Sequence, residues 1–202
     1  MPLHAKAWQD AARRLGLRVS KRAIYEWEGE PGVVTASTLL SRAGRPASAQ
    51  VIAGLLDDKE QRFQRLARRV AVHPRLEALV ANLSARGLPL ALVTGTSARE
   101  VRRVIPRGLR EQFSAVVTGN QVRRGKPHPE PYRTALRQLQ IRPRRAIVVE
   151  NAPYGIRSAR GAKVGLVVAL ASSLPSRFLR DADVVVSSVP QLCARLNTLL
   201  GQ

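Results

Sequence analysis

The stretch that decides the fold is Val148-Val149-Glu150-Asn151-Ala152-Pro153-Tyr154-Gly155-Ile156. It consists of an apolar run that ends in a carboxylate and an amide, followed by a tight turn and the start of a helix. In open α/β sheets, ligands bind just outside the carboxyl ends of the strands. Carboxylate and amide oxygens are ligands of hard cations such as Mg²⁺. We therefore predict a metal site at Glu150 and Asn151, with a polar pair that caps the helix as the alternative.

Strand and helix patterns alternate on both sides of this stretch, from His73 onward. Short apolar runs, typical of strands buried on both faces, occupy 88–93, 115–118, 146–149, 164–170 and 184–186. Helical patterns lie between them, at 76–83, from Ser97, at 131–139 and from Ile156. The alternation predicts an α/β fold with a parallel, Rossmann-like sheet and helices on both faces.

The first 72 residues show a different pattern, because apolar residues recur there at helical spacing only. One stripe stops at Gly16, and another runs over 52–70. Breakers that contain glycine and proline separate several helices. We therefore predict two domains, a helical domain over 1–72 and the α/β domain over 73–202.

The net charge is +20, from 34 basic and 14 acidic residues, and 29 of the basic residues are arginines spread along the chain. Such a charge attracts polyanions, so a nucleic-acid-binding module is one interpretation. Aromatic residues make up only 4% of the chain, which argues against a stacking platform for single strands. We expect a solvated basic surface that attracts anionic substrates, and no nucleic-acid partner.

Membrane and secretory features are absent from the sequence. No apolar run reaches the roughly 18 residues of a membrane span, and the charged first 21 residues lack the apolar centre of a signal peptide. The single cysteine, Cys193, forms no disulfide within one chain, which fits a reducing compartment. We therefore expect a cytoplasmic protein without a membrane partner. The sequence indicates no particular oligomeric state.

A second polar loop follows the apolar run at 88–93. Ser97 and Glu100 have the spacing of a capping box, so a helix begins there and its free N–H groups face the end of the strand. With the Thr94 hydroxyl and the bare backbone of Gly95, they predict a small anion cradle. The alternative is an ordinary strand–loop–helix joint with a serine cap.

The third polar loop is Gly125-Lys126-Pro127-His128-Pro129-Glu130-Pro131. Its prolines restrict the backbone, so the Lys126 ammonium is held on a stiff support. A lysine in such a position neutralises a phosphoryl group or a neighbouring carboxylate. The alternative is a solvent-exposed lysine before a helix that starts with proline.

In this order, the loops at Thr94, Lys126 and Glu150-Asn151 resemble the second, third and fourth motifs of the haloacid dehalogenase-like (HAD) hydrolase superfamily. The nearest branch is the phosphatase and β-phosphoglucomutase-like group, which has a helical cap. The beginning of that cap resembles Met1-Pro2-Leu3-His4-Ala5-Lys6-Ala7-Trp8. The resemblance covers essentially the whole chain and implies that residues 1–72 form the cap.

The resemblance also implies a role for each matching residue. In the family, an aspartate attacks a phosphoryl group to form an aspartyl-phosphate, and Mg²⁺ neutralises the transferring oxygens. At the position of Asn151 many members have aspartate, so the amide attracts Mg²⁺ less strongly. The implied catalytic residues are Lys126 and Thr94, the implied binders of phosphate and substrate are Thr94, Gly95, Thr96 and His4, and the implied metal ligands are Glu150 and Asn151.

The nucleophilic aspartate of the family has no counterpart in this chain. The family's Asp-x-Asp motif lies on a strand directly before the residues that match Met1-Pro2-Leu3-His4. Asp181-Ala182-Asp183 has the same spacing, but it lies near the C-terminus and precedes a strand. We expect that the natural protein is longer by this strand. Without it, the sheet would have a gap between the strands that carry the second and fourth motifs, with unpaired backbone groups.

The expected function is that of a Mg²⁺-dependent phosphatase, a phosphoric monoester hydrolase that acts on small phosphorylated metabolites. The 202 residues by themselves are expected to be inactive, because they lack the nucleophile. A phosphosugar mutase of the β-phosphoglucomutase type is the close alternative. The others are a catalytically inactive remnant, which binds a phosphorylated ligand or a protein, and the nucleic-acid-binding module.

Overall fold

The computed structural model describes residues 2–67 and 72–201. The first segment is helical, with α1 (Pro2–Arg14), α2 (Lys21–Glu26), α3 (Gly32–Arg42) and α4 (Ala49–Ala67). Gly16 lies just beyond α1 with a φ of +69°, a conformation that favours glycine. The predicted helices of this segment are confirmed, whereas Val70, at the end of the second predicted stripe, lies outside the described residues.

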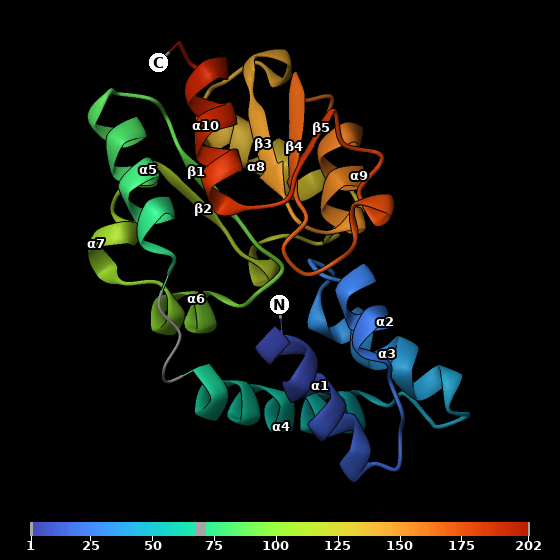
Figure 1. Cartoon of the computed structure of the whole chain (residues 1–202). Coiled ribbons are helices and arrows are strands. Elements are labelled where there is room, and N and C mark those ends of the chain that lie inside the picture. Colours follow the sequence, from blue (N-terminus) through green and yellow to red (C-terminus); the bar gives the residue numbers. More distant parts are fainter. Residues whose placement is uncertain (1, 68–71, 202) are drawn as a thin grey trace.

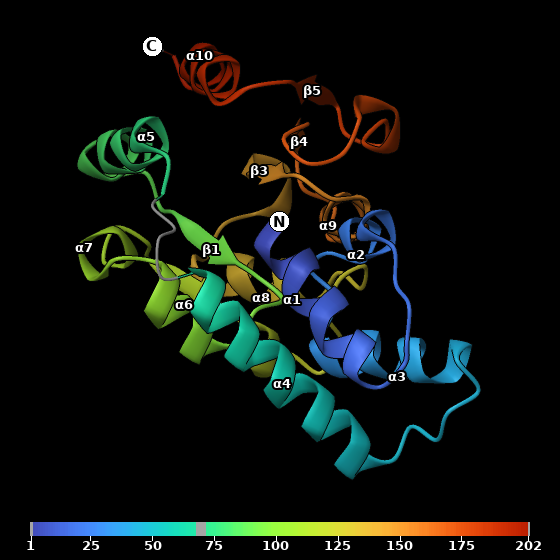
Figure 2. The same ribbon diagram turned by 60° about the horizontal axis from the view of Figure 1, so that its bottom comes forward.

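The four N-terminal helices share one apolar core. α1 packs along α4, which lies below it, and α3 packs against α4 (Figure 2). Trp8, Ile24, Leu40 and Leu55 are buried in this core. Leu174, from the second segment, is buried in the same cluster, so the helices pack against the α/β part and do not stand apart from it.

The second segment alternates between strands and helices, as predicted. Its strand pairs are all parallel, which confirms the α/β fold class. The strands are β1 (Ala91–Val93), β2 (Ala115–Val117), β3 (Ile147–Glu150), β4 (Leu166–Leu170) and β5 (Val184–Val186). The helices are α5 (Pro74–Ala85), α6 (Ala98–Val104), α7 (Arg107–Arg110), α8 (Glu130–Gln138), α9 (Pro153–Gly161) and α10 (Val189–Leu199).

Three helices differ from the prediction. α9 begins at Pro153, three residues before the predicted start, because proline suits the first turn of a helix, where its missing N–H is not needed. α7 is a short turn that the sequence patterns do not indicate. They do not indicate α10 either, although Ser188 caps this helix and Leu192 and Leu196 are buried at helical spacing.

The side chains of β4 show how helices cover the sheet. Val167 and Ala169 pack with residues of α8 and α9, whereas Val168 packs with residues of α5 and α10. Successive side chains of a strand point to opposite faces, so helices bury both faces of the sheet at β4 (Figure 1). The predicted arrangement is confirmed at this strand.

The strands form two separate sheets. β1 pairs with β2 in one sheet, and the other has the order β3–β4–β5. Within the described residues no ladder joins β1 to β3, although these strands lead to Thr94 and Glu150. The Val149 side chain of β3 is 44% exposed, which is unusual for a strand in a parallel sheet. The division lies where the sequence predicts a missing strand.

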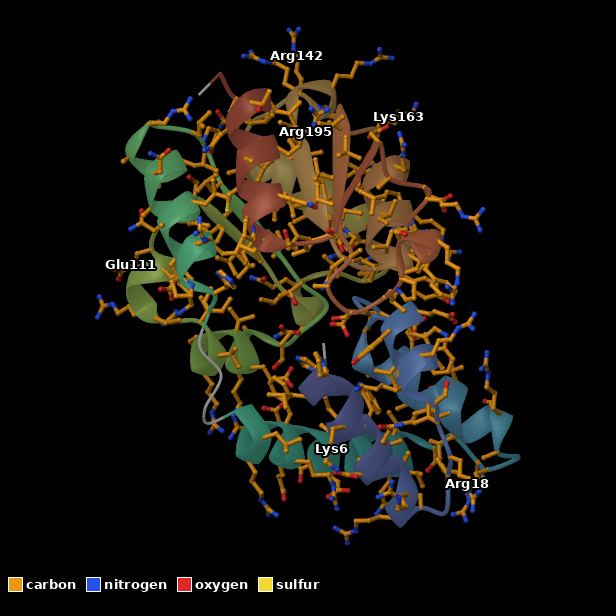
Figure 3. All side chains as sticks on the ribbon, in the orientation of Figure 1. Lys6, Arg18, Glu111, Arg142, Lys163 and Arg195 are labelled. Carbon is orange, nitrogen blue, oxygen red and sulfur yellow. The ribbon has the colours of Figure 1, made fainter. Side chains whose placement is uncertain are left out.

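Basic side chains project into solvent from both segments (Figure 3). Lys6 and Arg18 lie in the N-terminal segment, and Arg142 and Lys163 lie at the opposite end of the molecule. This distribution agrees with the predicted solvated basic surface. No helix within residues 2–67 and 72–201 combines the length and the apolar content that a membrane crossing requires.

Two valine substitutions test the burial of neighbouring strands. Val168→Ala is expected to lower the free energy of unfolding by about 2 kcal/mol, because it leaves a cavity between β4 and the helices α5 and α10. Val149→Ala is the matched change at an exposed position and is expected to cost less than about 0.5 kcal/mol. Urea unfolding measures both. Equal losses would show that the Val149 side chain is covered in the folded protein.

Candidate active site

Lys126 and Glu150 form a buried ion pair where the loop before α8 meets the end of β3. Lys126 Nζ lies 2.5 Å from Glu150 Oε1, and the side chains are 6% and 7% exposed. Tyr132 of α8 donates a second hydrogen bond to the same oxygen, and the Asn151 N–H donates to Oε2 at 3.1 Å. A buried carboxylate is stable when it is paired and hydrogen-bonded in this way.

Lys126 also links β3 to β1 across the division of the sheet. Its Nζ atom donates a hydrogen bond to the carbonyl of Val93, at 3.2 Å. Val93 is the last residue of β1 and Thr94 follows it, so the three predicted loops meet at one edge of the α/β part. The alternative of a solvent-exposed Lys126 is wrong, because the loop folds its side chain inward.

Tyr132 has a pKa raised well above its usual value, chiefly because the phenol is buried and further because of the negative charge of Glu150. The phenol therefore stays protonated and donates to Glu150. Lys126 Nζ also lies 5.1 Å from the centroid of the Tyr132 ring, within the range of a cation–π interaction. Sequence reasoning missed Tyr132, because a tyrosine in a predicted helix has the pattern of an ordinary core residue.

Gly155, in the first turn of α9, lets the Glu150 side chain lie against the helix. A Cβ atom at this position would lie 2.0 Å from Glu150 Cδ, so any larger residue would displace the carboxylate. The N-cap of α9 is Ala152, and no side chain caps the helix. The alternative in which Glu150 and Asn151 form a helix cap is therefore wrong.

The Thr94 loop begins α6 as predicted. Ser97 Oγ accepts a hydrogen bond from the Glu100 N–H at 3.2 Å, and the Glu100 carboxylate accepts one from the Ser97 N–H at 3.3 Å, which confirms the capping box. Thr94 Oγ1 accepts from the Thr96 N–H at 3.1 Å. The Gly95 N–H donates to no acceptor in the part of the chain that the structure describes, so it can bind an anion.

A cavity of about 580 Å³ lies between the N-terminal helices and the Thr94 loop. The loop between α2 and α3 touches its floor, since a Cβ atom at Gly95 would lie 2.5 Å from the carbonyl oxygen of Gly29. Gly29 also packs on Lys126, because a Cβ atom at Gly29 would lie 2.6 Å from Lys126 Cδ. The helices are therefore closed over the loop. Of the predicted site residues, those that line the cavity are Gly95, Thr96 and His4.

His4 forms part of the wall of this cavity. Its ring stacks on Phe63 of α4, with the ring centroids 3.9 Å apart. Burial, and next the charge of Lys59, lower the pKa of His4 to about 3, so the ring is uncharged at neutral pH. It offers a hydrogen-bonding group without a charge.

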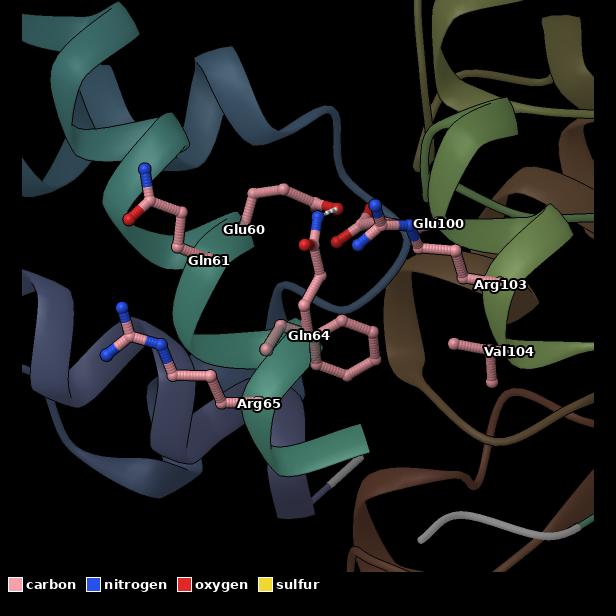
Figure 4. A pocket seen from close by; sticks show the side chains of 8 residues that line it. Glu60, Gln61, Gln64, Arg65, Glu100, Arg103 and Val104 are labelled. Atoms are coloured by element: carbon pink, nitrogen blue, oxygen red, sulfur yellow. Dashed lines mark hydrogen bonds between the residues drawn. The ribbon is translucent and has the colours of Figure 1, made fainter. Parts of the chain in front are cut away.

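A second buried ion pair joins the helices to the α/β part. Lys59 Nζ of α4 lies 2.6 Å from Glu100 Oε1 of α6. Burial raises the pKa of Glu100, but a hydrogen bond with Glu60 and the charge of Lys59 lower it to about 2. Burial and the hydrogen bond with Glu100 raise the pKa of Glu60 to about 7. Glu60 and Glu100 face each other in a side cavity of about 400 Å³, where Gln64 donates to Glu60 (Figure 4).

Glu150 and Asn151 offer oxygen donors of the kind that a hard cation binds. Glu150 offers a carboxylate, and the Asn151 amide forms no side-chain hydrogen bond with the described residues. Among those residues, no three histidine, cysteine, aspartate or glutamate side chains gather closely enough to hold a metal. Mg²⁺ usually binds one or two protein ligands together with phosphate oxygens and water. The two donors fit that mode of binding.

A sequence profile of the haloacid dehalogenase-like hydrolases matches residues 2–169. The match covers most of the chain and includes all three loops described above. The chain therefore belongs to the haloacid dehalogenase-like hydrolase family.

Individual relatives match the chain over most of their own length. The chain is 29% identical over 201 residues to protein CbbY of Cereibacter sphaeroides, covering 94% of this chain and 86% of the relative. It is 28% identical over 195 residues to hexitol phosphatase A of Escherichia coli, with 95% and 86% covered. The crystal structure of CbbY from Rhodobacter sphaeroides in complex with phosphate has a TM-score of 0.79 at 26% identity, with 94% and 88% covered.

Two glutamate substitutions test the buried pair. Glu150→Gln is expected to lower the free energy of unfolding by about 3–5 kcal/mol, because it leaves the Lys126 charge buried without its counter-ion. Glu111→Gln breaks the surface pair with Arg107, whose side chain is 85% exposed, and is expected to cost less than about 1 kcal/mol. Chemical denaturation measures both values. The buried pair is refuted as a stabilising contact if the Glu150 variant loses no more than the Glu111 variant.

Proposed function

We propose that this chain forms most of a Mg²⁺-dependent phosphatase that acts on small phosphorylated metabolites through an aspartyl-phosphate. The observation that carries the proposal is the position of Lys126. Its ammonium contacts both the Val93 carbonyl and Glu150, so a positive charge is fixed between the ends of two strands. Such fixed charge stabilises a phosphoryl group during its transfer.

The Thr94 loop would hold the phosphoryl group. The Thr94 hydroxyl and the Gly95 N–H lie at the end of β1, next to the carbonyl that binds Lys126. The Gly95 N–H would bind the anion, because the N–H groups of Thr96, Ser97 and Ala98 donate to Thr94, Glu100 and Asn120. The partial positive charge at the N-terminal end of α6 would add to this attraction. Thr96 and His4 line the cavity above this loop, where the rest of the substrate would lie.

Glu150 and Asn151 would hold Mg²⁺, the metal that phosphatases of this family generally use. When bound, Mg²⁺ supplies positive charge that neutralises the phosphoryl oxygens. Lys126 holds one oxygen of Glu150, at 2.5 Å, and so fixes the orientation of the carboxylate. The Asn151 amide is neutral and attracts Mg²⁺ less strongly than a carboxylate, so the phosphate oxygens would contribute more to the binding of the cation.

The nucleophile would be an aspartate on a further parallel strand between β1 and β3. Two observations support a strand at this place: β1 and β3 share no ladder, and Val149 is exposed. Such a strand would end beside Lys126 and Glu150, which flank the division. We infer that it comes from outside the 202 residues, and that these residues alone do not release phosphate.

The helices α1–α4 would act as the cap that closes over the substrate. Gly29 reaches the Thr94 loop and Lys126 from this side, so the closed arrangement excludes water from the phosphoryl site. Hexitol phosphatase A, which covers most of this chain, is named for the hydrolysis of a sugar-alcohol phosphate. This favours a phosphatase over a mutase and a small polyol or sugar phosphate as the substrate.

Two lysine substitutions test the phosphoryl site without requiring turnover. Lys126→Gln is expected to weaken the binding of inorganic phosphate to the 202-residue chain by about tenfold or more, since it removes a charge in contact with the anion. Lys163→Gln removes the same charge at an exposed site and is expected to change the affinity by less than about twofold. Calorimetric titration of each variant with inorganic phosphate, in the presence of Mg²⁺ and at physiological salt, measures both affinities.

The salt concentration matters, because a chain of net charge +20 binds anions non-specifically at low ionic strength. Circular dichroism of each variant shows whether it is folded. Equal phosphate affinity in folded Lys126→Gln and in the unsubstituted chain would refute the assignment of Lys126.

A further inference from the structure

The cavity above the Thr94 loop is acidic, although the chain has a net charge of +20. Among residues 2–67 and 72–201, five carboxylates and two cationic side chains line it. The chain has 14 acidic residues in all, so more than a third of them surround this one space. The carboxylates belong to Glu28, Glu30, Asp57, Glu60 and Glu100, and the cations to Lys59 and Arg99.

Four of the five carboxylates are satisfied within the protein, and Glu28 is the exception. Its carboxylate forms no hydrogen bond or ion pair with the described residues, although the residue is only partly exposed. A carboxylate in this position can accept a hydrogen bond from a bound substrate. The partners of the other four are Thr35 for Glu30, Gln61 for Asp57, Gln64 for Glu60 and Lys59 for Glu100.

The position of Glu28 relates it to the phosphoryl site. It directly precedes Gly29, whose backbone touches Gly95 on one side and Lys126 on the other. Burial raises the pKa of Glu28, while the charge of the amino terminus and next those of Lys126 and Lys59 oppose this rise, which places the carboxylate within electrostatic range of both lysines. A substrate whose phosphoryl group lies at the Thr94 loop would direct its leaving group toward Glu28.

We propose that Glu28 selects phosphate monoesters whose leaving group is neutral or cationic and excludes those that carry a second phosphate. The inference rests on the proposed function, because it requires the phosphoryl group to bind at the Thr94 loop. A hydroxyl or an ammonium group of the leaving group can donate a hydrogen bond to the Glu28 carboxylate. A second phosphate in the same place meets a like charge in a partly desolvated space, with Glu30 and Asp57 nearby in the lining.

Three probes with the same three-carbon chain measure this selection. They are 3-aminopropyl phosphate, 3-hydroxypropyl phosphate and propane-1,3-diyl bisphosphate, which carry a cationic, a neutral and an anionic group at the far end. They are titrated into the 202-residue chain with Mg²⁺ at physiological salt, where screening limits binding to the basic surface. We expect affinity to fall in the order given. The bisphosphate should bind about tenfold more weakly than the hydroxyl probe, the effect of a unit charge a few ångströms away in a half-solvated site.

Glu28→Gln tests whether this residue causes the selection. It removes the charge with little change of shape, and the ratio between the hydroxyl probe and the bisphosphate should fall by about tenfold. Glu26→Gln is the matched control on the preceding helical turn. Glu26 pairs with Arg22 at 2.8 Å and does not line the cavity, so the ratio should change by less than about twofold.

Inorganic phosphate separates this inference from the proposed function. If phosphate binds and depends on Lys126, but the three probes bind alike or Glu28→Gln leaves their ratio unchanged, the inference is overturned and the phosphoryl site stands. If phosphate itself does not bind, the proposed function fails, and the selection by Glu28 fails with it.

Discussion

The rest of the site depends on how the chain stabilises one buried carboxylate, that of Glu150. Lys126 and Tyr132 share one of its oxygens, and the neighbouring backbone N–H binds the other. Gly155 makes room for it at the start of α9. Because a buried charge without these partners would cost several kcal/mol, the loop before α8 must fold inward. That folding carries Lys126 to the end of β1, so stability and the proposed phosphoryl site have the same physical origin.

The second constraint is the division between β1 and β3. Among the described residues, side-chain contacts such as that from Lys126 to the Val93 carbonyl join the two sheets at this edge, and no ladder does. Neighbouring strands in a parallel sheet normally share a ladder. The N-terminal helices add a further link, because Lys59 reaches Glu100 of α6. The Lys59–Glu100 pair thus joins the N-terminal helices to the α/β part, whereas the Lys126–Glu150 pair lies within the α/β part.

The sequence predicts local features well because their signals are local. Short apolar runs between helical patterns predicted the positions of β1–β5. The Ser97–Glu100 spacing predicted the start of α6, and the three polar loops follow β1, β2 and β3. Contacts between distant positions leave no such signal. The Lys59–Glu100 pair and the hydrogen bond from Tyr132 to Glu150 were missed for this reason. The acidic character of the cavity was missed as well, since its carboxylates come from the loop between α2 and α3, from α4 and from α6. The division of the chain into cap and core stays a prediction, and so do the roles of all the predicted site residues: Thr94, Gly95, Thr96, Lys126, Glu150, Asn151 and His4.

The proposed function requires an aspartate on a strand between β1 and β3, which would complete the site from outside the 202 residues. The most direct measurement is the intact mass of the natively produced protein, together with its release of phosphate from an aryl phosphate in the presence of Mg²⁺. We predict an active protein whose mass exceeds 22.1 kDa by the mass of about 15–25 further residues, the length of a strand and its loop. An active protein of 22.1 kDa would contradict it, because the nucleophile would then lie within the chain described here.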